Sequence, residues 1–166
     1  MNRKLLATTF LLSIPFLSIN ANAHEPREGV SGTFNITVGQ RVEPAYSGEP
    51  NQFDLIVNNL DGTPANVAEI TLSVDVLFLK DDAFDAKVLH RALLADEIVR
   101  DRATPNRFNI PYMPTKPGAY GFEINGTING IQISEKYVCE NGTLNSLGKS
   151  FGCVEQIQMF PQKHKH

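Results

Sequence analysis

Apolar residues alternate with polar residues along most of the chain, and turn-forming residues separate the runs. Phe34, Ile36 and Val38 form the first clear row. The further rows are Phe53, Leu55 and Val57; Leu72, Val74, Val76 and Phe78; Phe108, Ile110 and Tyr112; and Tyr120, Phe122 and Ile124. A period of two residues is the signature of half-buried β-strands. The pattern therefore predicts an all-β domain.

The clearest local element is a hairpin in the last third of the chain. Asn129-Gly130 is a favoured two-residue hairpin turn, because both positions tolerate a positive φ. The return strand ends at Cys139 and places Ile131, Ile133 and Tyr137 on one face. Glu135 falls in the same apolar row. It indicates an edge position, a basic partner or a site.

Residues 87–100 have an ambiguous pattern. Val88, Leu89, Ala92 and Leu93 fit one face of a helix, but the segment lies among strands at regular spacing, and we favour a strand. With it, we expect about seven strands, mostly antiparallel. This count predicts a two-sheet sandwich of the immunoglobulin type. The chain has no tryptophan and no long-range cysteine pair, which distinguishes it from antibody domains.

The first residues predict a cleaved signal peptide over residues 1–23. Arg3 and Lys4 precede an apolar run, and Ala21-Asn22-Ala23 is a small-x-small site of the kind that signal peptidase cuts. We expect one β-sandwich domain over residues 24–161 and a flexible tail over residues 162–166. No later stretch is long and apolar enough to span a bilayer. These features predict a periplasmic or secreted protein.

Charge narrows the set of partners. The predicted signal peptide holds two basic residues and no acid, so 13 basic residues remain against 18 acidic ones and the mature net charge is −5. Nucleic acids and anionic lipid surfaces attract basic proteins. We therefore expect neither as a partner.

Both cysteines lie in the exported part. An even count in an oxidising compartment favours a disulfide between Cys139 and Cys153. A pair of soft metal ligands is the alternative, but the two residues do not form a C-x-x-C pair.

One stretch resembles a group of small secreted bacterial domains. Residues 114–122 read PTKPGAYGF and residues 126–130 read GTING, and the earlier residues 42–44 and 48–51 read VEP and GEPN. Together they are similar to immunoglobulin-like modules of the YtkA and CopC types. The resemblance implies an immunoglobulin-like sandwich, and some modules of this group are linked to copper handling. CopC-type proteins bind copper through an N-terminal histidine and further histidines, sometimes with a methionine-rich stretch, which this chain lacks.

His24 is the sharpest candidate metal ligand. Cleavage after Ala23 makes it the mature N-terminus, where its α-amine and ring Nδ1 chelate one ion. Nitrogen ligands of this kind suit copper(II). His90 is the candidate for a second imidazole. Cleavage after Ala21 instead places histidine third, which is another copper(II)-binding arrangement.

Other candidate groups are weaker. His164 and His166 form a tail motif, Met113 and Met159 are isolated soft donors, and Asp81, Asp82 and Asp85 lack the spacing of an EF-hand. The sequence contains neither a G-x-S-x-G nor an H-E-x-x-H motif. We therefore expect a non-enzymatic protein. Two functions remain open: an exported copper-handling accessory module, or a metal-free interaction domain of an envelope-protein complex.

Overall fold

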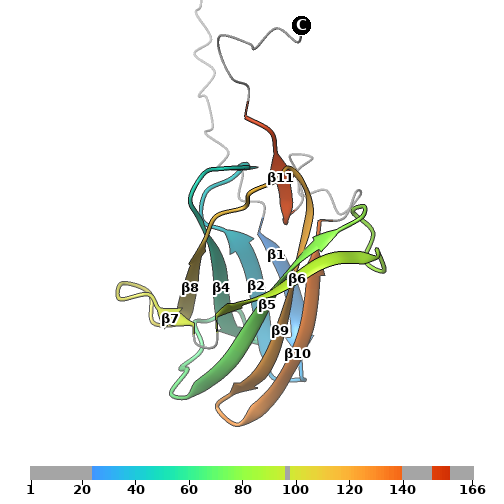
Figure 1. Cartoon of the computed structure of the whole chain (residues 1–166). Coiled ribbons are helices and arrows are strands. Elements are labelled where there is room, and N and C mark those ends of the chain that lie inside the picture. The colour runs from blue at the N-terminus through green and yellow to red at the C-terminus, as the bar shows by residue number, and fades with distance from the viewer. Residues whose placement is uncertain (1–23, 96–97, 140–150, 158–166) are drawn as a thin grey trace, which may run out of the picture.

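The computed structural model describes residues 24–95, 98–139 and 151–157. Its strands are β1 (Glu25–Val30), β2 (Phe34–Gln40), β3 (Ala45–Tyr46), β4 (Asn51–Asn59), β5 (Ile70–Leu79), β6 (Val88–Ala95), β7 (Val99–Arg100), β8 (Arg107–Tyr112), β9 (Gly118–Ile128), β10 (Ile131–Val138) and β11 (Cys153–Glu155). They form two sheets that pack face to face (Figure 1). The predicted antiparallel β-sandwich is confirmed.

Each sheet has a simple order. The first runs β1-β2-β4-β8-β7, and the second runs β3-β11-β9-β5-β6, with β10 also paired to β9. All pairs are antiparallel except β11 with β3. The predicted hairpin is β9–β10, with Asn129 at φ 50° and Gly130 at φ 78° in its turn.

All seven predicted strands are present, and residues 88–95 form a strand rather than a helix. The expected total of about seven is too low, because β1, β3, β7 and β11 are additional. β3, β7 and β11 have only two or three residues each. β1 reads EPREGV, which lacks an apolar row, and its Pro26 is tolerated because β1 is an edge strand. Period-two reasoning misses such elements.

The alternating rows meet between the sheets. Phe122 is fully buried at the centre, with its ring centroid 4.9 Å from that of Phe53 and 5.2 Å from that of Phe151. The Tyr120 hydroxyl donates to the carbonyl oxygen of Lys116 at 3.0 Å, in the manner of the tyrosine corner of immunoglobulin-like sandwiches. The PT-x-PG-x-Y segment thus fixes the entry to β9.

The predicted disulfide between Cys139 and Cys153 is present. β10 lies along β9 from Gly121 onward, and β11 pairs with Gly118 and Ala119 at the start of the same strand. The disulfide therefore joins two segments that follow one another along β9. It brings Phe151 and Val154 into the core, where their exposed fractions are 2% and 5%.

Several sequence predictions lie outside the described residues. They are the signal peptide (residues 1–23), the tail (residues 162–166) with His164 and His166, and Met159. The described residues contain no helix, and so none that is long and apolar enough to cross a membrane.

Candidate functional site

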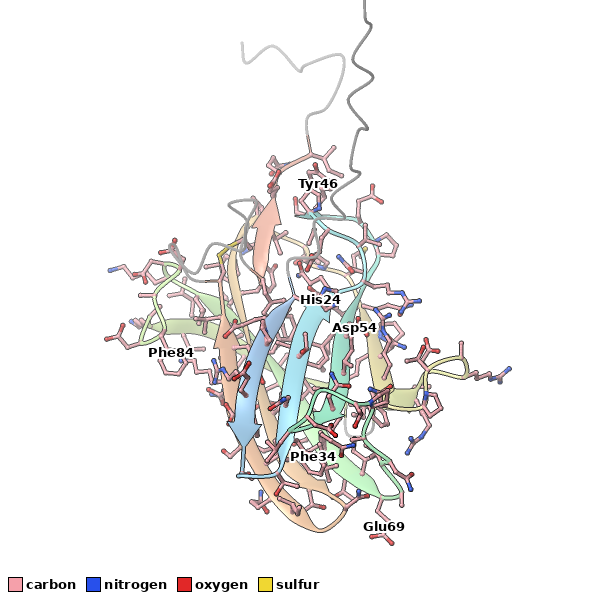
Figure 2. All side chains as sticks on the ribbon, turned by 180° about the vertical axis from the view of Figure 1, so that it is seen from behind. His24, Phe34, Tyr46, Asp54, Glu69 and Phe84 are labelled. Atoms are coloured by element: carbon pink, nitrogen blue, oxygen red, sulfur yellow. A yellow bond between two sulfur atoms is a disulfide. The ribbon has the colours of Figure 1, made fainter. Side chains whose placement is uncertain are left out.

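His24 lies just before β1, on the face of the first sheet that points away from the second sheet. The ladder between β2 and β4 pairs Gly39 with Asp54. The neighbours of Asp54 in β4, Phe53 and Leu55, belong to the core, so Asp54 lies on the opposite face. Figure 2 shows His24 beside Asp54. The alternation that builds the core thus also places a carboxylate on the outer face.

The His24 ring rests on Gly39. A Cβ atom added at Gly39 would lie 2.3 Å from Cδ2 and 2.5 Å from Nε2 of the His24 ring, which is closer than atoms can approach. Gly39 does not have a positive φ, so its backbone conformation does not require glycine. The absence of a side chain at Gly39 is therefore what makes room for the ring.

Asp54 holds the far side of that ring. Nε2 of His24 lies 3.0 Å from Oδ2 of Asp54, and Arg107 donates from Nε to Oδ1 at 2.6 Å and from Nη2 to Oδ2. Burial by itself raises the pKa of Asp54, but the hydrogen bonds from His24 and Arg107 outweigh it, and the pKa falls below its ordinary value of 3.8. The carboxylate is ionised at neutral pH.

The charge on Asp54 fixes the tautomer of His24. An ionised carboxylate only accepts hydrogen bonds, so Nε2 of His24 is the donor. In the neutral imidazole, the lone pair is then on Nδ1. Among the described residues, Nδ1 is buried and has no hydrogen-bond partner. A buried nitrogen without a partner calls for an explanation in a native protein, and a bound ion is one explanation.

The structure does not place His90 in the same sheet as His24. His90 lies on β6, opposite Phe78, with the two ring centroids 6.3 Å apart. It lines a groove together with Met113. Within residues 24–95, 98–139 and 151–157, no three His, Cys, Asp or Glu side chains gather as a metal-binding cluster. A copper site that uses both histidines stays a prediction with no contact behind it.

Glu135 has an edge position and a basic partner, two of the readings that its place in an apolar row indicated. It lies on β10, which pairs with β9 on one side, and it accepts a hydrogen bond from Nη1 of Arg27 at 2.6 Å. The aspartates of residues 81–85 lie in the turn between β5 and β6, where Asp81 accepts from the backbone N–H of Ala83. Neither feature forms part of the His24 site.

Sequence reasoning missed the other residues of the site: Gly39 and Asp54, which contact His24, and Arg107, which pairs with Asp54. One signal was available for Asp54, because it is an acid between two apolar residues of a predicted strand. Its partners on β2 and β8 required the strand register, which no local pattern gives.

The fold and the site define a class: an antiparallel β-sandwich in which a histidine contacts a buried aspartate that is paired with a half-buried arginine. Neither the family models nor the curated proteins include a match to this chain.

Proposed function

We propose that this chain is an exported accessory protein that binds copper(II) through the α-amine and Nδ1 of His24. The observation that supports the proposal is the state of the His24 ring. Nε2 donates to Asp54, while Nδ1, the nitrogen nearer the backbone, is buried without a partner in the described residues. Cleavage after Ala23 adds a free amine beside that nitrogen.

The residues around His24 fit such a site. A metal-bound histidine usually donates its other ring N–H to a carboxylate, which fixes the ring orientation and raises its basicity as a ligand. Asp54 fills this role, and Arg107 keeps Asp54 ionised. Copper(II) is the strongest binder of nitrogen ligands among the common divalent ions. Two nitrogens from one residue leave the remaining coordination positions to water or to a partner protein.

The direct test is calorimetric titration of copper(II) into mature protein that begins at His24. His24→Ala should abolish this site. A form with an acetylated α-amine should lose it as well, although the histidine is still present, because the acetylated nitrogen no longer binds the ion. Binding should weaken below neutral pH, since the amine must lose its proton.

Two substitutions test the residues that position the His24 ring without removing the ring itself. Gly39→Ala should displace the ring and lower the affinity for copper about tenfold or more, and Asp54→Asn should lower it by about 10- to 100-fold, as is usual for residues that orient a ligand. The electron paramagnetic resonance spectrum of bound copper should change in both variants.

The control removes residues 162–166, which contain His164 and His166. Copper binding that disappears with this tail and ignores a blocked N-terminus would overturn the His24 site. The chain would then be better explained as a metal-free interaction domain of an envelope complex.

A further inference from the structure

The second sheet ends in a long strand with a free edge. β6 spans Val88–Ala95 and pairs with β5 on one side. In the described part of the chain, no strand pairs with its other side. An open edge of this length presents a row of backbone N–H and C=O groups that another extended chain can pair with.

A groove lies beside this edge, between β6 and the end of β8. Its volume is about 380 Å³, and its wall includes Phe78, His90, Tyr112, Met113, Lys116 and Tyr120. A groove of this size lies within the range of ligand sites in proteins. The two faces of the free edge are therefore different: residues such as His90 and Ala92 face the groove, while Leu89 and Leu93 face solvent on the outer side.

Exposed apolar side chains are concentrated here. The exposed fractions are 52% for Leu93, 44% for Leu89 and 53% for Met113. An edge strand of a soluble protein is usually protected by charges, by proline or by β-bulges, and the ladder of β6 with β5 has a register shift near each end. β6 contains one arginine, Arg91, and it is already paired with Asp75 and Glu123 at 2.6 and 2.7 Å.

The charged side chains around the groove indicate the charge that a partner segment should carry. The wall of the groove contains Lys116 and His90 and no carboxylate, in a chain that has more acids than bases. The ammonium group of Lys116 forms no ion pair within the described residues. A carboxylate of the partner would complete it.

We propose that the free edge of β6 and the groove beside it bind an extended segment of a protein partner. The segment adds a strand to the second sheet, packs its apolar side chains against the outer leucines, and points its carboxylates into the groove toward Lys116. This interaction is independent of the copper site, because His24 lies on the other sheet.

The test uses mature protein and two synthetic peptides. The first peptide alternates leucine with glutamate, and its matched control has lysine in place of glutamate. We expect the acidic peptide to shift the backbone amide NMR signals of Val88–Ala95 and to bind at least about tenfold more tightly than the lysine peptide, a difference of about 1.4 kcal/mol.

Two variants locate the site. Leu93→Glu and Lys116→Glu should each weaken binding of the acidic peptide about tenfold or more. Leu60→Glu introduces the same charge at a leucine that is 56% exposed in the loop after β4, and it should leave binding unchanged. Because all three side chains are exposed, the variants should unfold at the wild-type temperature.

Three results would overturn the proposal. The first is peptide-induced shifts that lie away from β6, and the second is equal binding by Leu93→Glu and wild-type protein. The third is self-association of the wild-type protein that Leu93→Glu abolishes, because the occupant of the edge would then be a second copy of the chain.

Discussion

The two long edges of the sandwich are built differently. At one edge, Arg27 reaches from β1 to β10, where it donates to Glu135 and to the carbonyl oxygen of Lys136, each at 2.6 Å. Its guanidinium carbon also lies 4.2 Å from the centroid of the Tyr137 ring. At the other edge, between β6 and β8, a groove remains open.

Contacts at both ends also hold β1. His24, just before its first residue, contacts Asp54 on β4 of the same sheet. Ser31, just after its last residue, donates from its hydroxyl to the carbonyl oxygen of Gln132 on β10 of the other sheet. One edge is thus closed by side chains, although its strand has a polar sequence. The other edge has the more apolar strand, and the described residues there form no such closure. A few polar contacts, rather than apolar residues in the edge strand, therefore close the edge between β1 and β10.

Phe122 belongs to the core that both edges share, so its removal should have the largest effect. Phe122→Ala should lower the free energy of unfolding by about 3–5 kcal/mol, because it removes a fully buried ring between Phe53 and Phe151. Urea denaturation measures this change. A loss below about 1 kcal/mol would show that Phe122 is not at the centre of the core.

The disulfide extends the closed edge along β9, and we expect the second-largest effect there. Replacing both Cys139 and Cys153 by alanine should cost about 3 kcal/mol, the value typical for a loop with a sequence separation of 14. Loss of amide protection should concentrate in β11, because β11 contacts β9 over two residue pairs only. Free thiols in unreduced, unfolded wild-type protein would contradict the pairing.

Arg27 tests the closure itself. Arg27→Ala should lower the free energy of unfolding by about 2 kcal/mol, because it removes a half-buried ion pair and a cation–π contact together. Arg91→Ala is the matched control on β6, where the ion pairs are more exposed and screened by water. Equal losses in the two variants would mean that the edges do not differ in the way described.

The fold followed from sequence where one strand face is buried. The rows of Phe34, Phe53 and Phe122 repeat every second residue because each strand lies between core and solvent. The sequence did not predict β1, because its position depends on contacts of His24 and Arg27 with residues on other strands. Such contacts join residues far apart in the chain, and no local period records them.

The candidate site was half predictable. The choice of His24 rests on a predicted cleavage after Ala23, a signal that consecutive residues carry and that stays a prediction. Gly39, Asp54 and Arg107 come from three different strands and meet only through register. His90 shows the converse: its residue type was suggestive, but its strand lies in the other sheet.

Acid should loosen the attachment of β1 at Asp54. Because the folded-state pKa of Asp54 is below 3.8, the folded protein binds fewer protons there than the unfolded chain. The stability from this group is therefore fully present above about pH 5 and is lost as the pH falls through 3.8 toward the folded-state value. Thermal melts of metal-free protein should show this decline, and Asp54→Asn should lack the part due to Asp54.

The smallest effect is expected at the open edge. Leu93→Gln should change the free energy of unfolding by less than about 0.5 kcal/mol, because the side chain is 52% exposed and lies outside both core clusters. The same change should lower binding of the acidic peptide, so stability and binding separate at this residue. At the closed edge the reverse holds: Arg27→Ala should lower stability and leave peptide binding unchanged. If Leu93→Gln instead destabilised the protein as much as Arg27→Ala, Leu93 would be part of the fold, and the β6 edge would be no freer than the β1 edge.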